Sequence, residues 1–352
     1  MAYLRSAEDI YNEMVITITD VDTSENSWIY NALMPGCMRM SESLMNLDEA
    51  MKKGYASSAL VSGYSYYLEL RCAEMGIYRK QATYAVVPIK VTGKAGTILK
   101  KGSIVSTLDN RLYTTSEDLT LDKNGVGTVT VIADKPGSIY NLKANDLNYL
   151  PINYSGIISI TNENDYKDAY NEETDQELYN RYVLKVQTPA TSGNKYHYEQ
   201  WALEVTGVGS AKCISGAGIV RVIIANSNKR AASKELIKET YDHIDEVRPL
   251  LAGTLEVITV KEIPINITGN VEIDTSVTLG EVQTIFKELV EKYLDDKVYK
   301  AKKVNIAKIQ GLLIDIDGVL DCKDIKINGC TSNITLNEDE IAVLQNVNLG
   351  VM

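Results

Sequence analysis

The spacing of apolar residues changes twice along this chain, and those changes limit what it can fold into. Residues 1–84 repeat apolar side chains at helical intervals. Residues 85–160 instead hold short β-branched runs separated by glycine, a pattern typical of a small barrel or sandwich. Helical and strand-like segments then alternate, over 161–260 and again over 261–352. We therefore expect a multidomain α+β protein, with a helical N-terminal region, a small β-rich domain and two mixed αβ domains with short antiparallel sheets.

The N-terminal region should contain three helices. The first begins after Ser6, an N-cap residue followed by acids. The second covers about residues 24–53, and the pair Pro35-Gly36 should break or kink it. Residues 61–80 supply the third. The many Met and Tyr side chains of this region would be poorly buried on their own, so we expect a partner helix.

The composition argues against several classes of function. The 352 residues carry a formal net charge of −11, and a negative field repels phosphate backbones, so we expect no nucleic-acid binding. No stretch reaches the roughly 18 apolar residues of a membrane span, and the N-terminus lacks the apolar core of an export signal. The five cysteines form no CxxC pair, which is typical of a reducing cytoplasm. The 22 tyrosines suit partly wet protein–protein surfaces.

The run LLIDIDGVL, residues 312–320, is the most tempting catalytic motif. It resembles the first motif of haloacid-dehalogenase-type phosphatases, in which Asp315 would be the nucleophile and Asp317 the general acid, beside Mg²⁺. However, the apolar residues before Asp315 have helical spacing, and only about 30 residues follow the motif. We retain a phosphatase as the alternative function and favour a helix end followed by a turn.

The other candidates for chemistry have simpler interpretations. His197 and His243 are the only histidines, too few for a metal cluster. Cys213 lies in an apolar strand pattern, which favours a buried structural thiol. The glycine-rich steps lack a nucleotide-binding context, and the acidic run 162–177 lacks EF-hand spacing. We therefore expect no catalytic residues, no cofactor, no metal site and no enzymatic activity.

Residues 155–350 carry motifs that together resemble the phage baseplate J-like family, the wedge proteins of contractile tails. A Glu-Thr-Asp-x-Glu-Leu-x-x-Arg helix leads through a loop with Pro189 to Tyr-x-x-Trp-Ala and a Gly-Val turn. The matching residues are Glu173, Thr174, Asp175, Glu177, Leu178, Arg181, Gly193, Asn194, Tyr198, Trp201, Gly207 and Val208. The C-terminal segment is similar to the forms found in PBSX-type prophages. Tyr196-His197 replaces the commoner Ala-Asp before Tyr198, a small departure.

This resemblance implies a non-catalytic part of a baseplate wedge, in a contractile phage tail or a phage-tail-like bacteriocin. Two copies would associate with a smaller tail-I-type wedge protein through a helical bundle, and another wedge protein would link them to the sheath. Six wedges would close into a ring around the central hub and tube, and host binding would trigger sheath contraction. Such a protein assembles in the bacterial cytoplasm and ends in the baseplate of the released particle. A receptor-binding adhesin is disfavoured, because repeats are absent.

Within the motif, each part has an expected structural role. Trp201 should anchor a core rather than contact a ligand. The loop from Pro189 to Asn194 should set the angle between two helices. Gly207 should allow a tight exit from the second helix into the strand that contains Cys213.

Overall fold

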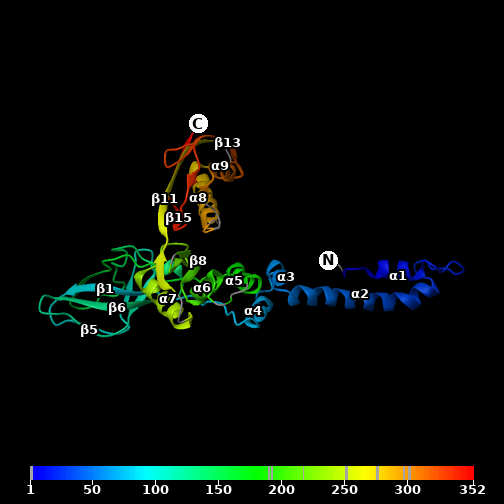
Figure 1. The fold of residues 1–352 in the computed structure, drawn as a ribbon, viewed down its shortest axis with the longest axis horizontal. Helices are drawn as coiled ribbons and strands as arrows, with labels where there is room; N and C mark the ends of the chain where they lie inside the picture. Colours follow the sequence, from blue (N-terminus) through cyan, green and yellow to red (C-terminus); the bar gives the residue numbers. More distant parts are fainter. Residues whose placement is uncertain are drawn as a thin grey trace. The chain divides into compact units, whose positions relative to one another are not determined.

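The chain is an α+β protein with several domains, as the sequence predicts (Figure 1). The computed structural model describes residues 3–188, 191, 193–216, 218–249, 253–274, 277–295, 298–299 and 303–352. These residues form two compact units that interleave along the sequence. Unit 1 comprises Met1–Arg79 and Glu173–Gln187, and unit 2 comprises Lys80–Glu172 and Thr188–Met352.

Unit 1 is helical. Its helices are α1 (Ala7–Val15), α2 (Trp28–Gly54), α3 (Ala56–Val61), α4 (Ser65–Ala73) and α5 (Asp175–Gln187). A capping box starts α1: the Asp9 amide donates to Ser6 Oγ at 2.9 Å, and the Ser6 amide donates to Asp9 Oδ2 at 3.3 Å. Hence the predicted cap at Ser6 is confirmed.

Two expectations about these helices need correction. The pair Pro35-Gly36 does not break the second helix, because α2 continues through it, and the alternative of a kink stays a prediction. Pro35 removes the hydrogen bond to the Asn31 carbonyl, but both residues are exposed, so water can satisfy that carbonyl. The expected helix over 61–80 is shorter, since α4 ends at Ala73 and a turn with Gly76 at φ +69° follows.

The core of unit 1 joins helices that are far apart in the sequence. Leu178 of α5 is fully buried in one cluster with Ala59 of α3 and with Leu68 and Cys72 of α4. Because these side chains come from three helices, α5 completes a core that α3 and α4 begin. A separate cluster packs α1 on α2.

Unit 2 begins with an open β-domain. Its strands are β1 (Val86–Gly93), β2 (Ile98–Leu99), β3 (Ile104–Ser106), β4 (Leu112–Thr115), β5 (Leu119–Thr120), β6 (Val126–Ala133) and β7 (Ile157–Thr161). Five of them form an antiparallel sheet in the order β3-β4-β6-β1-β7, and β2 pairs with β5. Val87, Ile89 and Val91 alternate inward along β1, as expected for a strand with one buried face.

A central αβ domain follows. Its elements are α6 (Lys195–Glu204), β8 (Val208–Gly216), β9 (Ile219–Asn226), α7 (Lys234–Val247) and β10 (Thr254–Thr259). The middle strand of its sheet is β9, which pairs antiparallel with β8 and parallel with β10. Tyr198 and Trp201 of α6 pack in the core of this domain.

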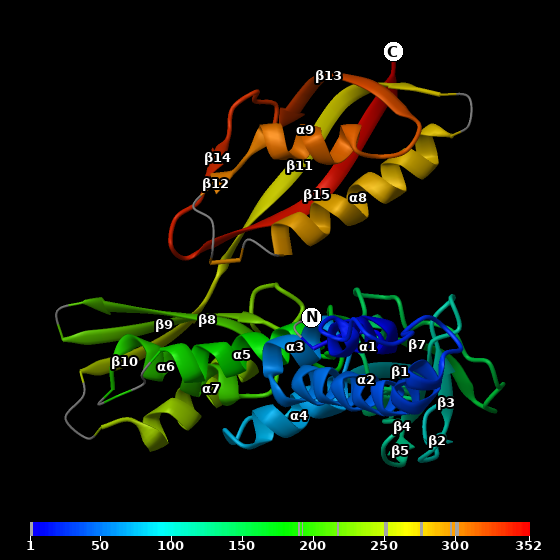
Figure 2. The ribbon, with the colours of Figure 1, turned by 90° about the vertical axis from the view of Figure 1, so that its right-hand side faces the viewer.

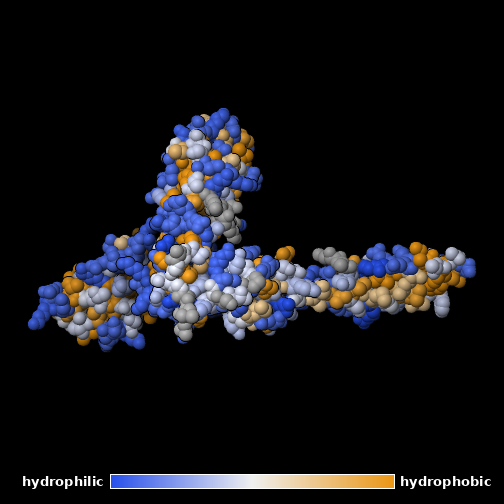
Figure 3. Space-filling model, viewed as in Figure 1, coloured by the Kyte–Doolittle hydropathy of each residue, from blue (hydrophilic) through white to orange (hydrophobic). Residues whose placement is uncertain are grey.

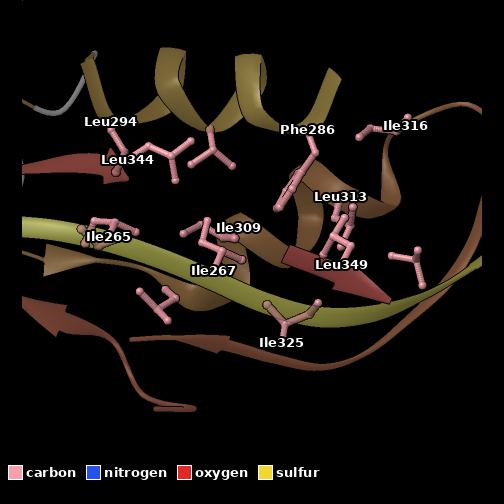
Figure 4. Packing of buried hydrophobic residues seen from close by; sticks show 14 of the residues in the cluster. Ile265, Ile267, Phe286, Leu294, Ile309, Leu313, Ile316, Ile325, Leu344 and Leu349 are labelled. Atoms are coloured by element: carbon pink, nitrogen blue, oxygen red, sulfur yellow. The ribbon is translucent and has the colours of Figure 1, made fainter. Parts of the chain in front are cut away.

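The C-terminal domain repeats a three-stranded plan. Its elements are β11 (Lys261–Ile273), α8 (Leu279–Asp295), β12 (Lys303–Val304), α9 (Ile306–Ile314), β13 (Val319–Ile327), β14 (Ile334–Thr335) and β15 (Glu340–Val351). Here β11 lies between antiparallel β13 and parallel β15, and Figure 2 shows α8 and α9 on one face of this sheet. Phe286 of α8 is fully buried between that helix and the sheet (Figure 4).

Candidate functional site

The first half of the sequence motif lies at the start of α5. The Glu177 amide donates to Thr174 Oγ1 at 3.3 Å, and the Thr174 amide donates to Glu177 Oε2 at 3.2 Å. This reciprocal pair is a capping box, which satisfies amides that the first helical turn leaves free. Three residues of the pattern therefore define where α5 begins, since Asp175 is its first residue.

Arg79 holds this helix start to the rest of unit 1. Its guanidinium donates to Glu69 Oε1, to the Glu173 carbonyl and to Asp175 Oδ1, each at 2.5 Å. The Ser65 hydroxyl also donates to the Asp175 carboxylate. The Arg79 side chain is only 10% exposed, whereas the side chains of Glu69 and Asp175 are 44% and 27% exposed, so a largely buried guanidinium makes charge-assisted hydrogen bonds to partly exposed carboxylates.

A second arginine closes the same region. Arg181 Nη1 donates to Glu173 Oε2 at 3.0 Å, and Arg181 Nη2 donates to the Tyr78 carbonyl at 3.2 Å. The Glu173 side chain is 6% exposed and the Arg181 side chain 16% exposed. Arg79 and Arg181 thus tie the segment around Tyr78 to the start of α5 from both sides. We call this set of contacts the arginine clamp: Ser65, Glu69, Tyr78, Arg79, Glu173, Asp175 and Arg181.

The clamp changes the ionisation of its members. The Ser65 hydroxyl and the Arg79 guanidinium hold the pKa of Asp175 below its ordinary value, against the opposite effect of burial. Burial raises the pKa of the nearby Cys72 thiol to about 11. A thiol with that pKa stays protonated near neutral pH, so Cys72 behaves as a core residue.

The second half of the motif lies on and around α6, in unit 2. Asn194 is the N-cap of α6, since its Oδ1 accepts from the His197 amide at 3.0 Å. Gly193 has φ +71°, and a Cβ on it would lie 3.2 Å from Pro249 Cγ. Pro189, the other named residue of this loop, lies outside the described residues, so the expected role of the loop stays a prediction.

An aromatic cluster occupies the core-facing side of α6. The ring of Trp201 stacks on His197 with centroids 3.9 Å apart and meets Tyr198 edge-on at 5.2 Å. Trp201 is 8% exposed and Tyr198 is 2% exposed. Both belong to the core that also contains Val208 and Cys213 of β8. These side chains are therefore placed to pack helix against sheet.

The turn after α6 is the tightest part of the motif. Gly207 has φ +96°, a conformation that residues with side chains rarely adopt. Val208 is buried and opens β8. Lys80 Nζ donates to the Val205 carbonyl at 2.9 Å and to the Val208 carbonyl at 2.8 Å, which ties both sides of the turn together. Lys80 is a residue that the sequence pattern did not single out.

The structure thus divides the motif between the two units. Glu173 to Arg181 belong to unit 1, and Gly193 to Val208 belong to unit 2. Each half provides a helix cap and core side chains, and the second half also provides the tight turn at Gly207. Arg79 and Lys80 contribute to them from outside the matched stretch, and no spacing signal connects these two residues to it.

The candidates for chemistry do not form a catalytic arrangement in the described part of the chain. Asp315 and Asp317 are exposed beyond the end of α9, so the apolar run before them is a helix and not the strand that a phosphatase motif requires. His243 contacts Glu204 at 2.9 Å, and Cys213 is buried with a pKa raised to about 11 by that burial. Among the residues described, no group of His, Cys, Asp and Glu could hold a metal ion.

Three segments of the chain match families of baseplate proteins. Residues 88–168 match the Baseplate J-like protein barrel domain, residues 190–259 the Baseplate J-like central domain, and residues 265–350 the Baseplate J-like protein C-terminal domain. The chain belongs to the baseplate J-like family. The resemblance drawn from the sequence motif is therefore confirmed.

Individual relatives of this baseplate J-like chain span most or half of its length. It is 29% identical over 353 residues to phage-like element PBSX protein XkdT of Bacillus subtilis (strain 168). This match covers 97% of this chain and 97% of XkdT. It is 30% identical over 193 residues to baseplate protein gp47 of Escherichia phage Mu, covering 53% of this chain and 52% of that protein. A chain in the cryo-EM structure of the anti-feeding prophage (AFP) baseplate is 11% identical with a TM-score of 0.37, over 97% of this chain and 98% of that chain.

The α2 helix of this baseplate J-like chain carries an open apolar seam. Its apolar residues recur at alternating steps of three and four, the spacing of a coiled coil. The seam residues are Tyr30, Leu33, Cys37, Met40, Leu44, Leu47 and Met51. Ile10 of α1 forms a buried cluster with Cys37, but Met40, Leu47 and Met51 are 47%, 44% and 39% exposed. Figure 3 shows apolar side chains gathered along α1 and α2.

Charged residues lie beside the apolar seam of α2. None of the helices that the structure describes has the length and apolar character needed to cross a membrane. Its exposed methionines and leucines alternate with charged residues such as Arg39 and Glu42, which form an ion pair at 2.7 Å.

Proposed function

We propose that this chain is a structural, non-catalytic component of the baseplate in a contractile phage tail or a phage-tail-like bacteriocin. The observation that carries the proposal is the ordered match of its barrel, central and C-terminal domains to baseplate J-like domains. The naming of its relatives XkdT and gp47 supports it further, since one is a phage-like element protein and the other a baseplate protein. The domain borders expected at residues 84, 160 and 260 belong to the same proposal.

Within the baseplate, the proposed role is that of a wedge subunit. The exposed seam on α2 supports it, because half of a coiled-coil surface is left without a partner in the described chain. Two copies of this chain would bind a smaller tail-I-type wedge protein through that seam. A further wedge protein would connect the complex to the sheath, and six wedges would close around the central hub and tube.

The proposed mechanism is a change of contacts between wedges. Host binding would rotate the wedges, widen the ring and release the sheath, and the helical seam and the C-terminal domains would supply the contacts that are exchanged. Assembly would take place in the bacterial cytoplasm, and the chain would leave the cell as part of the baseplate. The chain acts here by binding and positioning other subunits.

Co-expression tests the wedge role directly. The full chain would be purified alone and together with the small tail-I-type protein encoded beside it, and the mass of each sample would be measured by light scattering. We expect a stable complex, with two copies of this chain to one of the small protein. A monomer that binds no neighbouring tail protein contradicts the proposal.

Variants assign the complex to the seam. The triple variant Met40→Ser, Leu47→Ser, Met51→Ser should abolish the complex, because it removes the exposed half of the apolar seam. The matched control is Leu108→Ser, Ile139→Ser, Ile158→Ser, which changes three apolar residues of the β-domain that are 87%, 70% and 78% exposed. If both triple variants still form the complex, the partner binds elsewhere.

A further inference from the structure

Unit 2 contains a groove between the β-domain and the central domain, with a volume of about 650 Å³. Pro88 and Lys90 of β1 line one side, and Leu236, Glu235 and Glu239 of α7 line the other. The connecting segment 163–170 also lines it. A groove of this size has room for several side chains of a bound peptide segment.

The deeper part of the groove is apolar. Tyr170 and Leu236 are buried, at 6% and 5% exposure, and Val87 and Ile89 of the β-domain core also contribute to the lining. The Tyr170 hydroxyl donates to Asp168 Oδ1 at 2.9 Å, so its ring is held in one orientation. An apolar side chain that entered here would be removed from water against a fixed surface.

The outer part is acidic. Among the described residues that line the groove, five are carboxylates and one is an ammonium group: Glu163, Asp165, Asp168, Glu235, Glu239 and Lys90. Lys90 is already paired with Glu163 at 2.8 Å, so it does not neutralise the other side of the groove.

Two of these carboxylates form no ion pair with another described residue. Glu235 and Glu239 are exposed, one helical turn apart on α7, and neither forms a hydrogen bond or ion pair with another described residue. Like charges at this spacing repel each other and destabilise a helix. A bound cation would remove that repulsion, and the groove offers none of its own on this side.

We infer that this groove binds an extended basic segment of another protein, in which lysine or arginine alternates with apolar residues. The apolar side chains would contact Leu236 and Tyr170, and the cations would lie against Glu235 and Glu239. Alternation suits the site because its apolar part lies deeper and its acidic part lies further out, and an extended chain presents successive side chains on opposite faces. The inference concerns the chemistry of this groove and stands apart from the wedge proposal.

Peptide binding to the full chain tests the inference. The probe is a short fluorescein-labelled peptide in which lysine alternates with valine, followed by fluorescence anisotropy. One comparison peptide has glutamate in place of lysine, and another has serine in place of valine. We expect the lysine–valine peptide to bind most tightly, the serine peptide more weakly, and the glutamate peptide not at all.

A pair of charge variants on one helix locates the binding. The double variant Glu235→Gln, Glu239→Gln should weaken binding of the lysine–valine peptide by about tenfold. Asp242→Asn with Glu246→Gln removes the same charge from exposed positions of α7 outside the groove, and should change affinity less than about twofold. Circular dichroism would establish that both variants are folded.

Several outcomes overturn the inference. If both double variants weaken binding of the lysine–valine peptide equally, the attraction comes from the net charge of the whole chain. If the serine and valine peptides bind alike, the apolar part of the groove is not used. If the wild-type chain binds none of the peptides, the groove has no affinity for a basic segment, whatever the oligomeric role of the chain.

Discussion

The ring of Tyr170 lies directly against the backbone of Gly207, so that a Cβ on this glycine would be 2.8 Å from Cε2 of the ring. The turn that joins α6 to β8 therefore excludes a side chain for two independent reasons, because Gly207 also has φ +96°. The ring of Tyr170 is itself held in place by the hydrogen bond from its hydroxyl to Asp168. The end of the β-domain and the centre of the sequence motif consequently meet at a contact that tolerates little change.

Replacement of Gly207 by alanine should destabilise unit 2 by about 2 kcal/mol, since the new Cβ would be strained and would displace the Tyr170 ring. Urea unfolding would measure the loss. The control is Gly280→Ala, because Gly280 lies within α8 with nothing within 4 Å of a built Cβ. That change should be neutral or stabilise by up to about 1 kcal/mol. Equal effects of the two substitutions would contradict the assigned geometry.

The two tryptophans should behave in opposite ways. Trp201→Ala should cost about 3–5 kcal/mol of unfolding free energy, because it leaves a cavity beside Tyr198 and His197. Trp28 is 84% exposed, so Trp28→Ala should change the stability of the isolated chain by less than about 0.5 kcal/mol. In a Trp28→Phe background, the remaining fluorescence should be blue-shifted in the folded protein. Emission at the wavelength of free tryptophan would show that Trp201 is not buried.

The arginine clamp predicts that one substitution has a large effect on the stability of unit 1. Arg79→Met should destabilise unit 1 by about 3 kcal/mol, because the carboxylate of Asp175 and the carbonyl of Glu173 lose a desolvated donor. Hydrogen exchange of the α5 amides should then accelerate. Arg39→Met is the control, since the Arg39 side chain is 83% exposed and its ion pair with Glu42 should contribute less than about 1 kcal/mol. Unchanged exchange in Arg79→Met would mean that α5 is held by its apolar core alone.

The clamp also predicts how stability depends on pH. The pKa of Asp175 is below its ordinary value in the folded protein, so below about pH 4 the unfolded chain binds the proton more readily. The contribution of its carboxylate should be fully present at neutral pH and should be lost as the pH falls through the lowered pKa. The advantage of wild type over Asp175→Asn should thus shrink between about pH 4 and pH 2, as measured by urea unfolding at each pH. An advantage that grows on acidification would reverse the assigned sign.

Much of the secondary structure followed from local sequence. The Glu-Thr-Asp-x-Glu-Leu-x-x-Arg motif predicted the helix α5, and both partners of the capping box at its start are present. Short β-branched runs predicted strands over residues 85–160, and β1 is one of them, with inward side chains Val87, Ile89 and Val91. These features were predictable because the residues that determine them are at most a few positions apart.

The partners of the arginine clamp could not be predicted in this way. Arg79 and Asp175 are 96 residues apart, and nothing in the spacing of either indicates the other. Likewise, no local pattern reveals that Leu178 completes the core of α3 and α4. Pro35 misled the prediction for a different reason: a proline on the exposed side of a long helix costs one hydrogen bond that water replaces.

The interleaving of the two units has a consequence for synthesis on the ribosome. The helices α3 and α4 emerge early, but the side chain that fills their core, Leu178, is made roughly a hundred residues later. At typical translation speeds of about 5–20 residues per second, the nascent helices wait about 5–20 s without it. During that interval the apolar surface of unit 1 is open to chaperones and to other nascent chains. The order of synthesis therefore delays the completion of unit 1 until the whole β-domain has been made.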